Sequence, residues 1–456
     1  MYSLYSRSGI AHVAVSAVVR FSAAVRLARK TRHGRDDAQG CPVGFLWTLR
    51  MAWILLRFER LAAFETREGV HAMLHQNSVF HSLLQYVPWH KFDQSVENHG
   101  ADALSRSLNS KQHFIALLYG QLSAATSLRE IVTGMSSHET RLYHLGAAPV
   151  RRSTMSDANS RRPWQVFSEL FTATLAQAHR GLRRATKDAV RLIDSTSVRL
   201  SSLSEDWATF SADVFGVKAH IVYDPHADRP IYFAVTPANI NDITAAKTVP
   251  IEPGATYVYD LGYYDYGWWA GLDDAGCRFV TRLKKNTPFT VVHENRVSKV
   301  GNIISDKIGY LPARLARSRK NPMQVPVREI RVIIDTGKLL RIVTNDLDAP
   351  AEEIADLYKQ RWQIELFFRW IKQVLRIKRF IGVSENAVRI QLAVALIAYL
   401  LLRLAQAAQK LVHSPLDFAR LVRANLMHRR PIDRLLEPLQ PIPTNPNQLK
   451  LGLYFT

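Results

Sequence analysis

Cysteine is nearly absent from this sequence of 456 residues. Only Cys41 and Cys277 occur, which excludes a disulfide-stabilised scaffold and a zinc site made of Cys-x-x-Cys pairs. So few cysteines are typical of a protein in a reducing compartment, and we predict a cytoplasmic location. A long apolar run is also missing: the longest, Leu392–Leu402, is shorter than the roughly 20 residues of a membrane-spanning helix. We therefore expect that segment to form a buried helix, and we expect no membrane partner.

Acidic residues are scarce relative to basic ones. The chain has 39 Asp and Glu against 60 Lys and Arg, a net charge of +21. Such an excess favours a polyanionic partner, with nucleic acid as the first candidate and a membrane surface as the second. No long basic amphipathic helix with a clear apolar face supports the second candidate. The hydrophobic content of 47% excludes a wholly disordered chain.

The periodicity of apolar residues changes along the chain. Spacings of three and four residues, which indicate helices, continue to about Leu182, and short β-rich runs begin after Arg184. Helical spacing returns at Ala351 and extends to about Ile377. We predict four regions, in chain order: a basic extension at 1–72, a helical DNA-binding domain at 73–184, an α/β catalytic domain at 185–405 with a β-rich insertion at about 286–346, and a C-terminal tail at 406–456.

The first two of these regions leave alternatives open. Residues 1–72 hold ten Arg and one Lys against five acidic residues, a net charge of +6, and Met73 stands directly before the first well-patterned segment. The extension is therefore either a basic arm of the protein or sequence upstream of a start at Met73. For residues 73–184, the alternative to DNA binding is a solvated basic face on a structural domain.

Three carboxylates stand out by their positions. Asp194 and Asp260 each end a short apolar run, so we expect both at or near strand ends, where side chains can face a cleft. Glu365 lies inside the helix predicted at Tyr358–Ile377. Carboxylates that converge in this way can hold divalent metal, which phosphoryl transfer uses to stabilise the attacking and leaving oxygens. Oxygen ligands favour Mg²⁺ or Mn²⁺.

Each carboxylate alone is weak evidence, because an Asp at a strand end is more often a turn residue or a helix cap. Four other aspartates compete by the same criterion: Asp206, Asp213, Asp224 and Asp242. Helix geometry strengthens the case for Glu365. At about 100° per residue, four polar side chains fall within an arc of about 60°: Tyr358, Arg361, Glu365 and Lys372. The alternative is an exposed helix face with an ion pair between Arg361 and Glu365.

These four residues also have the spacing of a known signature, Tyr358-x-x-Arg361-x-x-x-Glu365-x-x-x-x-x-x-Lys372. It resembles the Y-R-E-K signature of the IS-four family of transposases from bacterial insertion sequences. Asp194-Ser195-Thr196 and Asp260-Leu261-Gly262-Tyr263 precede it in order, and with Glu365 they look like the DDE triad of that family. The resemblance begins near His75 and runs to about Ala405.

The resemblance implies a ribonuclease-H-like fold, with Asp194 on the first strand, Asp260 at the fourth and Glu365 on a late helix. It implies a β-rich insertion between the second and third acids, where we predict strands at Pro288–Thr344. Some members stack a flipped base on a Trp of the insertion. This chain has no Trp between Trp269 and Trp362, so that role would fall to another aromatic residue.

The activity that the resemblance implies is cut-and-paste DNA transposition in the bacterial cytoplasm, in association with the nucleoid. Asp194, Asp260 and Glu365 would hold two Mg²⁺ or Mn²⁺ ions. Tyr358, Arg361 and Lys372 would contact DNA. The partners would be double-stranded DNA, as terminal inverted repeats and as target, and a second copy of the chain in a synaptic homodimer. Two alternatives are a nuclease of the same fold without strand transfer and a DNA-binding regulator that has lost catalysis.

Overall fold

The structure is a computed structural model, and it describes seven stretches of the chain: 77–182, 189–211, 214–298, 301–314, 319–375, 380–409 and 414–437. Three features named from the sequence lie outside the described residues: the extension at 1–72, the alternative start at Met73, and Asp213, one of the aspartates that compete with the triad. The chain separates into two compact units, Met1–Leu74 and His75–Thr456. The second unit contains every described residue.

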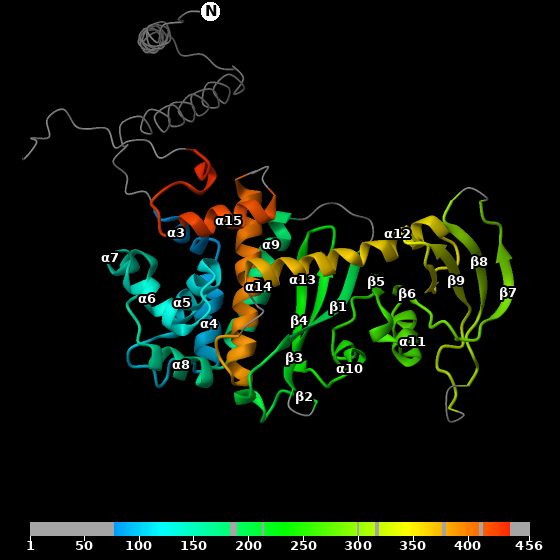
Figure 1. Cartoon of the computed structure of the whole chain (residues 1–456), viewed down its shortest axis with the longest axis horizontal. Helices are drawn as coiled ribbons and strands as arrows, with labels where there is room; N and C mark the ends of the chain where they lie inside the picture. Colours follow the sequence, from blue (N-terminus) through cyan, green and yellow to red (C-terminus); the bar gives the residue numbers. More distant parts are fainter. Residues whose placement is uncertain are drawn as a thin grey trace, which may run out of the picture. The chain divides into compact units, whose positions relative to one another are not determined.

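Helices form the described chain up to Leu182, as the spacing of apolar residues predicted (Figure 1). Local signals set where they begin. Asn109 caps α5 in a capping box with Gln112, which satisfies backbone N–H groups that the first turn leaves free. The helices are α3 (Val79–Leu84), α4 (Trp89–Asn98), α5 (Ser110–Ser123), α6 (Leu128–Ser136), α7 (Glu139–Leu142), α8 (Arg152–Arg161) and α9 (Trp164–Leu182).

The strands that follow have the order β4-β3-β1-β5-β6. Strand β3 pairs antiparallel with both β1 and β4, whereas β5 runs parallel to β1 and β6 runs parallel to β5. This is the ribonuclease-H-like topology that the sequence predicted. The elements are β1 (Val190–Arg199), β2 (Thr209–Ser211), β3 (Val214–Asp224), β4 (Arg229–Pro237), α10 (Asp242–Ala246), β5 (Thr256–Tyr259), α11 (Tyr266–Asp274) and β6 (Arg278–Arg282).

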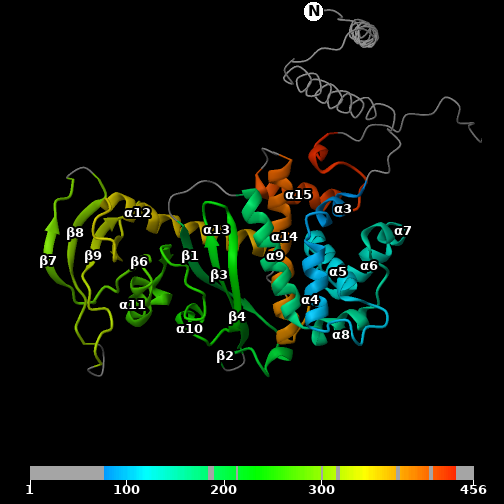
Figure 2. The same cartoon turned by 180° about the vertical axis from the view of Figure 1, so that it is seen from behind.

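The β-rich insertion continues the same sheet. Its last strand, β10, pairs antiparallel with β6 and with β9, and the order continues through β8 to β7 at the outer edge (Figure 2). Among the described residues the sheet therefore has ten strands. A buried ion pair between Arg328 and Asp306 ties β9 to β8, at 2.7 Å. The insertion strands are β7 (Thr290–Asn295), β8 (Ile303–Tyr310), β9 (Val327–Ile333) and β10 (Leu339–Thr344).

The helix predicted from Ala351 to Ile377 is in fact two. Helix α12 covers Ala351–Gln360 and α13 covers Trp362–Val374, with Arg361 between them. The N–H of Arg361 donates to the carbonyl of Tyr358 at 3.1 Å. This is a three-residue bond of the 3₁₀ type in place of the four-residue bond of an α-helix, so the prediction of one continuous helix is wrong at this point.

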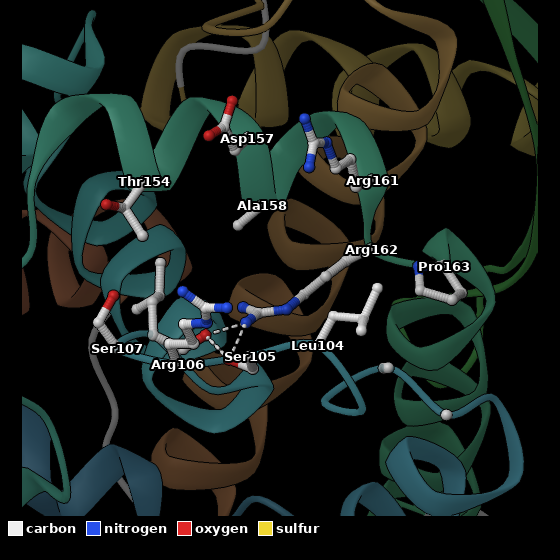
Figure 3. Close-up of a pocket in the computed structure, with 13 residues that line it drawn as sticks. Leu104, Ser105, Arg106, Ser107, Thr154, Asp157, Ala158, Arg161, Arg162 and Pro163 are labelled. Carbon is white, nitrogen blue, oxygen red and sulfur yellow. Dashed lines mark hydrogen bonds between the residues drawn. The ribbon is translucent and has the colours of Figure 1, made fainter.

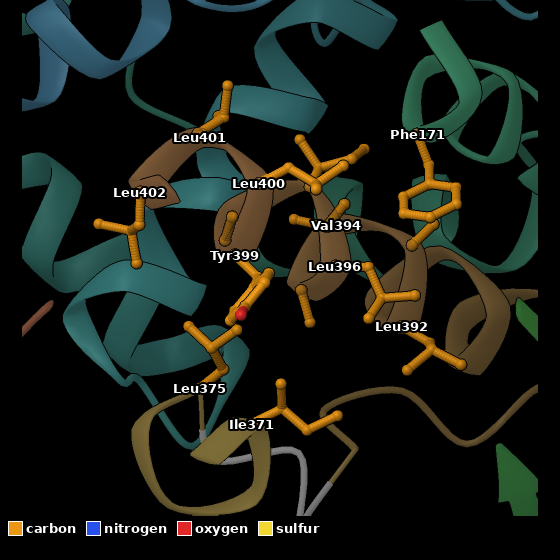
Figure 4. Packing of buried hydrophobic residues seen from close by; sticks show 14 of the residues in the cluster. Phe171, Ile371, Leu375, Leu392, Val394, Leu396, Tyr399, Leu400, Leu401 and Leu402 are labelled. Carbon is orange, nitrogen blue, oxygen red and sulfur yellow. The ribbon is translucent and has the colours of Figure 1, made fainter. Parts of the chain in front are cut away.

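Helix α14 (Glu385–Ala408) is the core of the described unit. It is long and apolar enough to cross a membrane, but 89% of its most apolar window is buried within the protein. The buried helix predicted at Leu392–Leu402 is thus confirmed. Figure 1 shows α14 between α5 and β4, and it contacts both as well as α9. Figure 4 shows its side chains packed with Phe171 of α9 and Ile371 of α13.

A further helix follows within the range predicted as a tail. Helix α15 (Pro415–Asn425) begins at Ser414, whose hydroxyl accepts the N–H of Asp417. Its residues Phe418 and Val422 are buried in the same apolar cluster as α14. Residues 406–456 therefore include an element of the core.

Candidate active site

Two of the predicted carboxylates follow neighbouring parallel strands at the same level. Strands β1 and β5 pair up to Ile193 and Tyr259, so Asp194 and Asp260 are the next residues on each. Paired strands lie about 4.8 Å apart, which brings the two aspartates to one edge of the site. The prediction that Asp194 ends its strand is wrong. Strand β1 continues to Arg199 because the longer β3 still pairs with it, and Asp194 marks only the end of the pairing with β5.

Arg361 connects the first carboxylate to the third. Its Nη2 donates to Oε1 of Glu365 at 2.7 Å, and its Nη1 lies 3.6 Å from Oδ2 of Asp194. The ion pair that was the alternative interpretation of this helix is therefore present, and it extends to the strand. The apolar side of α13 is buried, through Ile364, Phe367, Phe368 and Ile371. That burial holds Glu365 against β1.

The electrostatics of Asp194 reflect the other two acids. The pKa of Asp194 is raised to about 7 by the balance of several effects: burial raises it most, Asp260 and Glu365 also raise it, and the N–H of Ser195 and the charge of Arg361 lower it. Neighbouring like charges disfavour the ionised form of a buried carboxyl group. The three acids thus act on one another, and a cation among them would favour their ionised forms.

Tyr358 and Lys372 occupy different surroundings. Tyr358 is only 8% exposed; burial raises its pKa, and the nearby Arg361 and Arg282 lower it. The guanidinium of Arg361 lies over the Tyr358 ring, 5.9 Å from its centre. Lys372 is half-buried in the last turn of α13, seven residues or about 10 Å along the axis from Glu365. Contacts of these residues with DNA stay predictions.

The donor chemistry fits a divalent metal. Asp194, Asp260 and Glu365 offer only carboxylate oxygens, the ligands that Mg²⁺ and Mn²⁺ prefer. Within the stretches that the structure describes, no group of three or more Asp, Glu, His or Cys side chains is arranged to hold a metal ion. In this arrangement the guanidinium of Arg361 neutralises Asp194 and Glu365.

A fourth carboxylate, Asp242, lies beside this group. Its Oδ1 accepts the hydroxyl proton of Ser195 at 2.9 Å and lies 3.1 Å from Nζ of Lys218. The imidazole Nδ1 of His220 is 3.9 Å from the same oxygen. The sequence named Asp242 only as a competitor of the triad. The proximity to Asp194 depends on a loop between β4 and α10, and nothing in the local sequence reports that approach.

The other competing aspartates have different environments. Asp224 ends β3 and lies 3.5 Å from Arg191 and 3.7 Å from Arg229. Asp206 is exposed in a turn. Neither of them approaches Asp194 within the described contacts.

The comparisons with known proteins agree with this geometry. A family model described as the transposase DDE domain matches residues 185–401, a range that contains Asp194, Asp260 and Glu365. A second model, a domain of unknown function, matches residues 75–148. The fold and the acidic site thus define a DDE enzyme, and the chain belongs to the DDE transposases of insertion sequences.

Individual relatives are similar over most of their length. The chain is 42% identical to "Putative transposase y4zB" of Sinorhizobium fredii, over 64% of this chain and 81% of that protein. It is 31% identical to "Probable transposase for insertion sequence element IS5377" of Geobacillus stearothermophilus, over 70% of this chain and 87% of that protein. Among solved structures, a piggyBac transposase synaptic complex with hairpin DNA matches 81% of this chain and 84% of that chain, at 10% identity and a TM-score of 0.42.

Proposed function

We propose that this enzyme moves an insertion sequence by cut-and-paste transposition in the bacterial cytoplasm, at the nucleoid. The observation that carries the proposal is that Asp194 and Asp260 follow the paired stretches of β1 and β5 at the same level, while Arg361 bridges Asp194 to Glu365 of α13. The same residues lie within the range that matches the transposase DDE domain. The net charge of +21 supplies the attraction for DNA.

The chemistry would proceed in two successive displacements at phosphorus. Water attacks the phosphorus at the element's end, the bond to the element's 3′ oxygen breaks, and the products are a 3′-hydroxyl group and a 5′-phosphate on the flank. That hydroxyl oxygen then loses its proton and attacks a phosphorus in target DNA, and a target 3′-hydroxyl group leaves. In both displacements an incoming oxygen, from water in the first and from the 3′-hydroxyl group in the second, replaces a 3′ oxygen on phosphorus, so one site serves both.

The residues divide these tasks. Asp194, Asp260 and Glu365 would hold two Mg²⁺ or Mn²⁺ ions, which when bound activate the attacking oxygen and stabilise the leaving one. Arg361 would neutralise phosphate charge through the fork that now contacts Glu365 and Asp194. Lys372 would contact the backbone of the same DNA. Tyr358 would contribute through its position under Arg361 and through the backbone contact that the signature predicts.

Strand transfer is the step that tests this function. The purified chain is incubated with Mg²⁺, a DNA fragment that carries the element's ends, and a target plasmid, and the products are sequenced. Transposition predicts element 3′ ends joined to target DNA. Cleaved ends without joined products would support the nuclease, and binding without cleavage would support the regulator. Light scattering of the protein–DNA complex tests for the two copies that paired ends require.

The helical region also has a cationic cavity suited to a DNA phosphate. The cavity has a volume of about 380 Å³ and is lined by the loop at 100–108 and the end of α8. Figure 3 shows Arg106, Arg161 and Arg162 around it. Arg106 and Arg161 are exposed, and no ion pair to either is found in the part of the chain that the structure describes.

Arg162 forms the fixed part of the cavity. It is buried and donates to the carbonyl oxygens of Leu108 and Asn109 and to the hydroxyl of Ser105. The carboxylate of Asp102 is 3.5 Å away. Burial lowers the pKa of Arg162 and Asp102 raises it. The cavity therefore places three guanidinium groups, together with the carboxylate of Asp157, around the space for one anion, and we propose that this anion is a phosphate of the element's end.

The double variant Arg106→Ala/Arg161→Ala should weaken binding of end DNA and lower the slope of log affinity against log salt by about one, since the cavity holds one phosphate and each phosphate contact contributes about one. Fluorescence anisotropy at several salt concentrations measures both. The matched control is Arg151→Ala/Arg152→Ala, which removes the same charge from the exposed start of α8. Equal effects of the two double variants would mean that only net charge matters and would refute the cavity as a phosphate site.

A further inference from the structure

We propose that Asp242 is a positioning residue of the reaction centre: it fixes strand β1 and the turn after β5 relative to each other, and Lys218 cancels its charge. The inference rests on the proposed function, because it assigns Asp242 a part in the geometry of the same acidic site. Asp242 would contact neither the reacting phosphate nor the ions.

The faces of β1 explain how Asp242 reaches the site. Val190 and Leu192 point into the apolar cluster shared with α13 and α14, whereas Ile193 points into the cluster on the opposite face of the sheet. Side chains alternate along a strand. Asp194 therefore faces α13 and Arg361, and Ser195 faces α10, where its hydroxyl donates to Oδ1 of Asp242 at 2.9 Å.

The second oxygen of Asp242 lies against the turn that carries Asp260. A Cβ atom added at Gly262 would lie 3.0 Å from Oδ2 of Asp242 and 3.0 Å from Oδ1 of Asp260. Oδ2 of Asp242 and Oδ1 of Asp260 thus both lie beside Gly262. Because each is 3.0 Å from the same point, the two oxygens are at most 3.0 + 3.0 = 6.0 Å apart. The N–H of Gly262 donates to Asp260 at 2.8 Å. Asp242 consequently contacts the β1 side of the site with one oxygen, and its other oxygen lies near the glycine in the turn after β5.

The charge of Asp242 is matched by a neighbouring cation. Nζ of Lys218 lies 3.1 Å from Oδ1 of Asp242 and also donates to the carbonyl of Ile240 at 2.9 Å. Both side chains are mostly buried. Two further titratable groups on this side are buried, His220 and Tyr263, and the pKa of Tyr263 is raised by burial and then by Asp194, Asp242 and Asp260. Because the pair is neutral, Asp242 can fix the backbone geometry without adding negative charge to the three acids.

The ordinary explanation of an aspartate at the start of a helix does not account for these contacts. The cap residue of α10 is Asn241, and no side chain caps this helix. Asp242 is the first helical residue, and its oxygens meet Ser195, Lys218 and Gly262 rather than free N–H groups of α10. The turn-or-cap interpretation that applied to competing aspartates therefore fails for this one.

Binding of Mn²⁺ to the full-length protein tests the proposal independently of activity. Asp242→Asn should weaken Mn²⁺ binding, measured by isothermal titration calorimetry, by at least about tenfold, the range seen when groups that orient metal ligands are replaced. The Mg²⁺ concentration that gives half-maximal cleavage should rise by the same factor. Binding of end DNA in the presence of chelator should stay within about twofold of the wild type.

Two further variants make the result decisive. Ser195→Ala removes only the hydroxyl link and should weaken Mn²⁺ binding in the same direction, and it decides the matter if Asp242→Asn does not fold. Asp228, in the β3–β4 hairpin, forms an ion pair with Arg403 of α14 at 3.0 Å. Asp228→Asn removes the negative charge of that pair and should leave Mn²⁺ binding unchanged. Wild-type affinity in both site variants, or an equal loss in Asp228→Asn, would overturn the proposal. Absence of strand transfer by the wild type would count against the proposed function alone.

Discussion

Asp194→Asn should abolish cleavage at the element's ends, with a loss of roughly 10³-fold or more, the scale at which removal of one preorganised charge-stabilising group acts. Asparagine has the same shape, but it cannot supply the negative charge that pairs with Arg361 and that a metal ion requires. Cleavage of an end-containing plasmid in Mg²⁺, followed by gel electrophoresis, measures the loss.

Binding of the ends should persist in that variant, because Asp194 is one side chain within a large basic surface. Anisotropy in the presence of chelator separates binding from chemistry. Asp206→Asn is the matched control: the same substitution at an exposed turn should retain full activity. Cleavage by Asp194→Asn at the wild-type rate would remove Asp194 from the mechanism.

Leu396→Ala should lower the free energy of unfolding by about 2–5 kcal/mol, the cost of a cavity in a well-packed core. Leu396 is 0% exposed and lies in the middle of α14, within the apolar cluster that includes α9, α13 and β1 (Figure 4). Urea unfolding followed by circular dichroism measures the change at the first transition.

The same substitution at Leu104 provides the comparison, because Leu104 is 98% exposed and Leu104→Ala should change stability by no more than about 0.5 kcal/mol. If the two variants unfold at the same urea concentration, α14 does not have the central role in packing that its burial indicates.

Much of this fold could be predicted because its strands and helices carry strong local patterns. Alternation and β-branched residues predicted the strands around Asp194 and Asp260, and the apolar run in α14 predicted a buried helix. The three acids Asp194, Asp260 and Glu365 could be predicted as a group from residue types at fixed spacing. The resemblance to a family supplied the order of the strands, which local pattern alone does not give.

The features that the sequence did not reveal depend on distant pairing. Strand β1 continues past Asp194 because β3 pairs with it, and no residue within β1 reports the length of its partner. Arg361, at the break between α12 and α13, also contacts Asp194 on the distant strand β1, which no local pattern reports. Asp242 is ordinary in its own segment, and only the folded sheet brings it beside Ser195.

The pairing of β10 with β6 has a mechanical consequence. Three backbone registers, Ile342 with Arg282, Val343 with Thr281 and Thr344 with Val280, join the insertion to the catalytic sheet. Strand β6 is in turn paired with β5, which ends at Tyr259, directly before Asp260. A pull on the outer strands would therefore load a continuous ladder of hydrogen bonds rather than bend a hinge. DNA bound to the insertion and the carboxylate that follows β5 would therefore move together, because one hydrogen-bonded sheet connects them.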